Sequence, residues 1–226
     1  MSTVTDTAQR LRLECGFPDI PLASPRSRDR LLAVRDAAVA EFRLHGYLGG
    51  SVDEIARGSG VSKPTIYSYF DTKERLFLDA IGDALISAYT GLSPVGEWSS
   101  ARTAREAVRA FLLDWARRLL SPETIALRRT VIGEAERFPR LASLWALTNA
   151  TYGDRPLAEA LTAMSRAGLL DLPRGDLPLR QLIAMAVGAP QLVATFRPAD
   201  FDAAELPEIA EGAVAVFWSS YGKEDR

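Results

Sequence analysis

The sequence has very little of the two residue types that most often bind transition metals or activate nucleophiles. Cys15 is the only cysteine and His45 the only histidine in 226 residues. An intrachain disulfide and thiolate clusters for zinc or iron–sulfur centres are therefore excluded, and so is a metal site built on several histidines. We accordingly expect no metal, no cofactor and no catalytic residues, and we expect that the protein is not an enzyme.

Long apolar runs are also missing. No stretch approaches the ~18 uninterrupted apolar residues that span a bilayer, and the N-terminal residues lack the apolar run of a signal peptide. The mean hydropathy is −0.01, as in ordinary globular proteins. We therefore expect a cytoplasmic protein without a membrane partner. The net charge of −2 argues against non-specific coating of nucleic acid, but it allows a local basic surface.

Helical periodicity is present along most of the chain, whereas strand-like alternation is nowhere convincing, so we predict an all-α fold. Gly16, Pro18 and Pro21 interrupt residues 1–25, which we expect to form a flexible N-terminal extension. Residues 26–75 are predicted to form a three-helix, helix-turn-helix DNA-binding domain. Residues 76–221 are predicted to form a larger helical bundle, with segments near 102–120, 122–136, 139–152, 155–167, 177–195 and 204–220. The family resemblance described below implies that this bundle serves effector binding and dimerisation.

The helix-turn-helix prediction depends on turn and cap signals. An amphipathic helix over Arg28–His45 precedes residues 51–54, which have the form of a capping box in which Ser51 and Glu54 bond to each other's backbone N–H. Gly60 suits a turn that needs a positive φ, and Ser62 is placed to cap a helix that runs through Phe70. A long helix from Thr72 to Tyr89 follows.

The second helix of this motif has one apolar edge. Ile66 and Phe70 lie on the same side of a helical wheel, where they would face the supporting helices. The opposite side and its flanks carry small, polar and aromatic residues, namely Lys63, Pro64, Thr65, Tyr67, Ser68 and Tyr69. No acidic residue occurs between Gly58 and Phe70, so we expect a phosphate to meet no repulsion there.

Three short runs follow one another closely in this region: SVDEIA at residues 51–56, GVSKPTIYSYF at 60–70 and KERLF at 73–77. Together they resemble the DNA-binding domain of the tetracycline-repressor (TetR) family over about Arg28 to Ala80. The resemblance implies that Thr65, Tyr67 and Tyr69 contact phosphates and that Lys63, Pro64 and Ser68 face base edges. It further implies that Lys73 contacts the DNA backbone and that Ser51 stands where family members contact a phosphate or a base. Alternatively, Tyr67 and Tyr69 are surface aromatics and Ser51 is only a helix cap.

The resemblance also implies a homodimer on a palindromic double-stranded DNA operator, because one helix-turn-helix covers too few base pairs. Residues 182–193 and 209–218 are apolar over more than one stripe, which is typical of helices that pack both inside a subunit and against its mate. The alternative is that they are core helices. Repression, rather than activation, follows only from the habit of the family.

The run VIGEAERFP at residues 131–139 is similar to the AefR-like branch of that family. This similarity implies a small-molecule effector that releases the DNA, and we take Phe111, Trp115, Trp145 and Tyr152 as candidate ligand-binding residues. Two other functions remain open. One is a helix-turn-helix regulator controlled by a protein partner, without a small-molecule pocket. The other is an all-α enzyme whose chemistry would use Glu134 and Glu136 and which carries an accessory helix-turn-helix.

For the N-terminal extension, it stays open whether Arg10 and Arg12 reach a minor groove of the DNA.

Overall fold

The computed structural model describes residues 2–17, 20 and 24–223. These residues form α-helices joined by short turns, and they contain no β-strand apart from one isolated bridge between Leu170 and Gly222. They pack into two compact units, one of residues 1–90 with 126–148 and one of residues 91–125 with 149–226. The all-α fold predicted from the sequence is confirmed.

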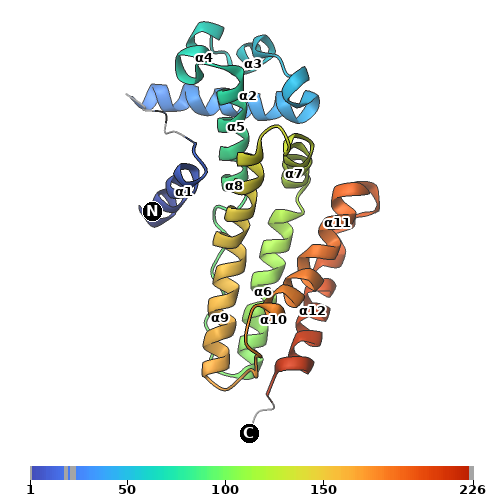
Figure 1. Ribbon diagram of the computed structural model, residues 1–226. Helices are drawn as coiled ribbons and strands as arrows, with labels where there is room; N and C mark the ends of the chain where they lie inside the picture. The colour runs from blue at the N-terminus through green and yellow to red at the C-terminus, as the bar shows by residue number, and fades with distance from the viewer. Residues whose placement is uncertain (1, 18–19, 21–23, 224–226) are drawn as a thin grey trace. The chain divides into compact units, whose positions relative to one another are not determined.

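The first unit holds the helix-turn-helix. Its elements are α1 (Ser2–Glu14), α2 (Pro25–Gly49), α3 (Val52–Ser59), α4 (Lys63–Phe70), α5 (Lys73–Ser87), most of α7 (Pro122–Glu134) and α8 (Pro139–Asn149). Helix α2 packs against both α3 and α5 (Figure 1), so it is the element that supports the motif.

Helix α2 begins where the sequence provides a cap and a proline. Ser24 accepts a hydrogen bond from the backbone N–H of Ser27, and Pro25 occupies the first turn, where its missing N–H costs nothing. The buried side of the helix consists of Leu31, Val34, Ala38 and Phe42. At Gly46 the backbone has φ 64° and kinks, and one more turn follows to Gly49. The predicted helix over Arg28–His45 is thus the main part of a longer one.

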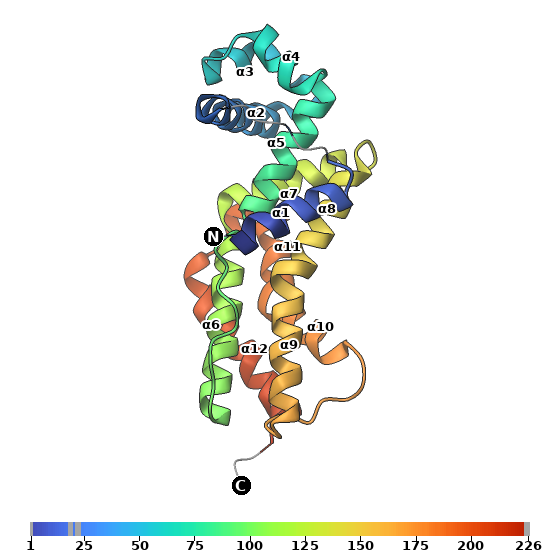
Figure 2. The ribbon, with the colours of Figure 1, turned by 90° about the vertical axis from the view of Figure 1, so that its left-hand side faces the viewer.

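Helix α1 occupies much of the predicted N-terminal extension. It lies beside α5 (Figure 2), and the side chains of Leu11 and Arg12 are buried. Arg12 forms an ion pair with Asp79 of α5. A guanidinium held by a buried carboxylate is not available to DNA, so the idea that Arg12 reaches a minor groove is wrong. Arg10 is exposed, and its Nε lies 3.5 Å from Oε1 of Glu14.

Hydroxyl side chains cap α3, α4 and α5. Ser51, Ser62 and Thr72 accept the backbone N–H groups of Glu54, Thr65 and Arg75, over 3.4, 3.4 and 3.1 Å. The capping box predicted at Ser51 is only half formed. The Glu54 carboxylate pairs with Arg57, and the backbone N–H of Ser51 donates to Glu41 Oε1 at 2.9 Å. A carboxylate on α2 thus takes the place that the sequence assigned to Glu54.

The second unit is built around α6 (Ala101–Leu119) and α12 (Leu206–Tyr221), which lie side by side (Figures 1 and 2). The other elements are α9 (Arg155–Arg166), α10 (Leu177–Ile183), α11 (Ala189–Phe196), π-turns at Ala150–Asp154 and Ala184–Gly188, and 3-10 turns at Pro198–Asp200 and Ala203–Glu205. Buried side chains include Val108, Trp115, Leu161, Val214 and Phe217.

Each π-turn ends two residues before a proline. The turns end at Asp154 and Gly188, and Pro156 and Pro190 follow. A proline has no N–H for the carbonyl one turn earlier, and a π-turn lets the helix continue past it with a different bonding pattern. The break predicted between residues 152 and 155 is therefore a change of helix type, and the helix predicted over 177–195 contains a second such change.

One helical run among the described residues, Leu177–Phe196, is long and apolar enough to cross a membrane by length and composition alone. Core and interface helices of soluble proteins share these properties, and a π-turn interrupts this run. It is therefore weak evidence for a membrane span.

Candidate nucleic-acid interface

A left-handed glycine separates the two helices of the motif. Gly60 has φ 66° and ψ 16°, a conformation that residues with a Cβ atom rarely adopt. After it, Ser62 is extended and caps α4, whose first turn accommodates Pro64. These local preferences fix the direction in which α4 leaves α3. The helix-turn-helix predicted from the sequence is confirmed in the structure.

Helix α4 has one buried and one accessible side. Ile66 and Phe70 are 0% and 1% exposed, as the helical wheel predicts. Of the six residues expected to contact DNA, Lys63, Pro64 and Ser68 are exposed, whereas Thr65, Tyr67 and Tyr69 are half-buried. The structure thus gathers these six side chains on one short helix that is anchored by two buried residues.

Hydroxyl groups stiffen the first turns of α4. Ser62 Oγ and Thr65 Oγ1 are 2.8 Å apart, and Ser68 Oγ donates to the carbonyl oxygen of Thr65 at 2.7 Å. A hydroxyl has one donor and two acceptor positions. Because Ser68 uses its donor within the helix, its oxygen presents acceptor positions to an approaching base.

Lys63 is engaged with a carboxylate from α3. Its Nζ lies 2.9 and 3.0 Å from the two oxygens of Asp53, and both side chains are exposed. The hydrogen bond to Asp53 raises the pKa of Lys63. The absence of acidic residues between Gly58 and Phe70 therefore misleads about the charge of this surface. Asp53 brings a negative charge to α4 from ten positions earlier in the sequence.

Lys73, at the first position of α5, is held by the end of α2. Its Nζ donates to the carbonyl oxygen of Leu48 at 3.2 Å and lies 5.0 Å from the ring centroid of Tyr47. An ammonium group has three donors, so two of the three remain for a phosphate. Ser51, the eighth candidate, is half-buried and caps α3, which agrees with the cap interpretation and leaves its DNA contact untested.

The candidate ligand residues are not equivalent in the structure. Phe111 and Trp115 on α6 are 4% and 1% exposed, and their ring centroids are 5.9 Å apart. Tyr152 lies in the π-turn of the same unit and is half-buried. Trp145 belongs to α8 in the other unit, where its ring centroid lies 6.4 Å from that of Tyr89. The structure therefore brings Phe111 and Trp115 together and gives Trp145 other neighbours.

Glu134 has a role that sequence reasoning missed. Its Oε1 accepts the backbone N–H of Tyr47 at 2.9 Å, and its side chain is only 16% exposed. Glu136, by contrast, is exposed. The enzyme alternative needed both carboxylates for chemistry, but Glu134 already serves a structural hydrogen bond. In the sequence, Glu134 stands out only as part of the run VIGEAERFP. Nothing in that run indicates that Glu134 bonds to Tyr47.

Two family models match this chain. One, described as "Bacterial regulatory proteins, tetR family", matches residues 34–80, and one, described as "AefR-like transcriptional repressor, C-terminal domain", matches residues 106–223. The second match alone covers more than half of the chain, and the first includes all of α3 and α4.

Similar proteins of known name are transcriptional regulators. The regulator EthR of Mycobacterium tuberculosis is 34% identical over 84 residues, which are 37% of this chain and 38% of that protein. The chain thus spans less than half the length of the first curated relatives it matches. A crystal structure of a TetR-family regulator from Mesorhizobium loti has a TM-score of 0.71 at 26% identity and covers 88% of this chain and 100% of its own. The flavonoid-responsive regulator FrrA has a TM-score of 0.68 at 26% identity, with coverages of 87% and 98%.

Proposed function

This chain belongs to the TetR family of bacterial regulatory proteins, and from that premise we propose that it is a homodimeric transcriptional repressor. It binds a palindromic double-stranded DNA operator through α4 and is released by a small-molecule effector. The observation that carries this proposal is the helix-turn-helix itself. A glycine turn and two buried residues, Ile66 and Phe70, present the polar and aromatic side chains of α4 to solvent.

In this function α4 enters the major groove. Lys63, Pro64 and Ser68 face base edges, and the half-buried Thr65, Tyr67 and Tyr69 contact the phosphates at the groove walls. Ser51 and Lys73 bind backbone phosphates on either side. Lys63 exchanges its bond with Asp53 for a DNA contact, which the exposure of the pair allows. We keep residues 26–75 as the DNA-binding segment and 76–221 as the effector and dimer segment of this proposal.

Exposed apolar side chains support dimerisation through α11 and α12. Leu192, Phe196 and Val216 are 60%, 70% and 53% exposed, although Leu182 and Val214 on α10 and α12 are fully buried. Helices that are apolar on two sides suit an interface in which one side packs inside the subunit and the other against a twofold mate. A palindrome read by such a dimer requires two α4 helices about 34–36 Å apart. The interface also accounts for the apolar run Leu177–Phe196 without a membrane, as expected of a cytoplasmic protein.

The effector site of this proposal is the aromatic region of α6 and the π-turn after α8. Trp115 supports it, because its Nε1 is buried and has no hydrogen-bond acceptor among the described residues. Buried donors of this kind are normally satisfied, so an effector with an acceptor atom would complete the bond. Phe111 and Tyr152, which belong to the same unit as Trp115, would then contact the apolar part of the effector.

The test is a fluorescence-anisotropy titration of the full chain on DNA from immediately upstream of its own gene, against a scrambled duplex. We expect at least ~10³-fold tighter binding to the upstream DNA, with a steep salt dependence. Tyr67→Ala and Lys63→Ala should each weaken operator binding by about tenfold or more, and Lys63→Ala should also relax the sequence preference, because Lys63 faces base edges. Lys223→Ala, an exposed control outside the motif, should change neither. No preference for upstream DNA or for any duplex selected from random sequences would refute the proposal.

A further inference from the structure

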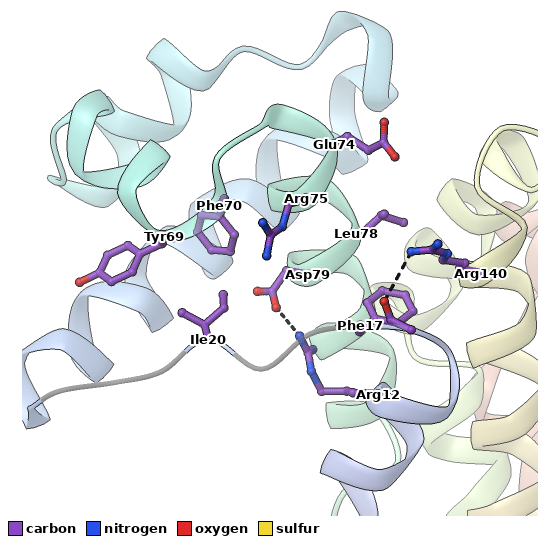
Figure 3. A pocket seen from close by; sticks show the side chains of 11 residues that line it. Arg12, Phe17, Ile20, Tyr69, Phe70, Glu74, Arg75, Leu78, Asp79 and Arg140 are labelled. Carbon is purple, nitrogen blue, oxygen red and sulfur yellow. Dashed lines mark hydrogen bonds and ion pairs between the residues drawn. The ribbon is translucent and has the colours of Figure 1, made fainter.

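A cavity of about 360 Å³ lies behind the C-terminal end of α4, within the first unit. Figure 3 shows it between α1, the end of α4 and the first turns of α5. Its apolar lining comes from Phe17, Ile20, Phe70 and Leu78. The volume lies within the range of small-molecule sites, and the lining combines apolar groups with a few charged ones, as such sites usually do.

Arg12 and Asp79 are the two buried charged groups on this lining. Arg12 is 7% exposed and forms an ion pair with Asp79, and Arg35 binds the same carboxylate through two hydrogen bonds of 2.7 and 3.0 Å. Arg12 Nη1 has no hydrogen-bond partner among the described residues, and the Asp83 oxygen that it faces is 3.6 Å away. Because Asp79 already serves two arginines, a buried donor of Arg12 still needs an acceptor.

Arg140 provides a second guanidinium with spare donors. Its Nη1 donates a 3.5 Å hydrogen bond to the carbonyl oxygen of Gly16, and no carboxylate in the described part of the chain pairs with it. In Figure 3, Arg140 lies next to Phe17, and Arg75 lies next to Asp79. Arg75 forms an ion pair with Asp71. The carboxylate of Glu74, in contrast, points away from Phe17 and Ile20. Asp79 also lines the cavity, but its carboxylate is already paired with Arg12 and Arg35, so Arg140 is the group on this lining that favours a negative ligand.

We propose that this cavity binds a small amphipathic monocarboxylate, aromatic or short-chain aliphatic. Its carboxylate pairs with Arg140 in the field of Arg12 and Arg75, and its apolar part packs against Phe17, Phe70 and Leu78. Bidentate pairing of a guanidinium with a carboxylate gives such a site its selectivity over neutral molecules of the same shape. The site is distinct from the aromatic residues of α6 proposed above for the effector.

Occupancy of the cavity is sensed by the DNA-reading helix. Tyr69 and Phe70, the last two residues of α4, line the cavity, and Glu74 and Arg75 line it from the first turn of α5. A ligand that prefers one position of α4 changes the affinity of that helix for DNA in proportion to this preference. This consequence rests on the proposed DNA-binding function, whereas binding of the carboxylate does not.

The first experiment measures binding without DNA. Isothermal titration calorimetry of the full chain with 2-naphthoate, and with neutral 2-naphthamide as its isostere, should give at least about tenfold tighter binding of the carboxylate. Arg140→Met removes one charge-assisted pair and should weaken 2-naphthoate binding by about tenfold while leaving the amide unchanged. Leu78→Trp fills the cavity and should abolish binding of both. Arg102→Met, which removes an exposed arginine on α6, is the control and should bind like the wild type.

Two results would overturn the site: no binding of 2-naphthoate to the wild type, or an affinity that stays the same in both Arg140→Met and Leu78→Trp. The DNA readout is then separate. Saturating 2-naphthoate should shift the operator affinity of the wild type by at least about threefold, and this shift should vanish in Arg140→Met. A chain that binds 2-naphthoate in this pattern but binds no specific DNA would refute the proposed function and leave the site intact. Specific DNA binding without 2-naphthoate binding would refute the carboxylate site and leave the proposed DNA-binding function intact.

Discussion

The carboxylate of Glu134 accepts the backbone N–H of Tyr47 at 2.9 Å, which joins the end of α7 to the last turn of α2. The kink at Gly46 turns this N–H out of the regular bonding of α2, and a Cβ atom at Gly46 would lie 3.4 Å from the same Glu134 oxygen. The ring of Tyr47 then packs against Phe77 and Phe138, with centroid distances of 5.3 and 4.8 Å. The helix-turn-helix, which α2 supports, is thereby attached to α7 through one residue of α2.

Replacement of Glu134 tests this attachment. Glu134→Ala leaves the N–H of Tyr47 without its acceptor, and we expect a loss of about 1–3 kcal/mol in the free energy of unfolding. Glu134→Gln keeps an oxygen at the same position and should recover most of that loss. Urea denaturation of the three proteins, followed by circular dichroism, measures both effects. Equal stability of the alanine variant and the wild type would show that the bond contributes nothing.

If α4 binds DNA as proposed, Asp53 should lower its affinity for DNA, because Asp53 adds a negative charge and pairs with Lys63. We expect Asp53→Asn to tighten operator binding by about threefold to tenfold at low salt and less at high salt. The same substitution in a Lys63→Met background separates the two causes. If Asp53→Asn tightens binding equally in both backgrounds, its effect is general electrostatic repulsion and the ion pair with Lys63 plays no part.

The parts of this structure that the sequence predicts are those that depend on near neighbours in the chain. Gly60, the cap at Ser62 and the buried edge of Ile66 and Phe70 all act within one or two helical turns. Their signals are therefore contained in short windows of sequence, and each is found where it was expected.

The contacts that sequence reasoning missed join distant residues. Glu134 and Tyr47 are 87 positions apart, and Arg12 and Asp79 are 67 positions apart. Which carboxylate meets which donor depends on how the helices pack, and residue type alone leaves many partners open. For the same reason Glu54 looked like the second half of a capping box, although Glu41 from α2 occupies that place.

Gly153 is required by close packing against Trp115. A Cβ atom at this buried position would overlap the indole ring, and the surrounding π-turn leaves the backbone little room to move. We expect Gly153→Ala to lower the free energy of unfolding by about 2 kcal/mol, as overpacking in a core usually does. Gly133→Ala is the matched control, because nothing lies within 4 Å of its Cβ position in α7. It should not destabilise the protein and should gain up to about 1 kcal/mol, since alanine is the better helix former. Thermal and urea denaturation measure both, and equal effects of the two substitutions would contradict the overlap with Trp115.

Asp154, next to Gly153, makes stability depend on pH in a direction that can be derived. Burial raises the pKa of its carboxyl group above the ordinary value of 3.8. Between the unfolded and the folded pKa the native state binds more protons than the unfolded state, so this group's contribution to stability falls as the pH rises through that window. Asp154→Asn cannot ionise. The stability of the variant relative to the wild type should therefore increase as the pH rises from about 4 to 7.

The measurement is urea denaturation of both proteins across this range, with exposed Asp171→Asn as the control for an ordinary surface carboxylate. The difference between variant and wild type isolates Asp154, because the other titrating groups are common to both proteins. A difference that does not change with pH, or that shrinks as the pH rises, would mean that the carboxyl group of Asp154 is not destabilised by its burial in the folded protein. In that case the π-turn before Pro156 would have to hold a solvated or paired carboxylate.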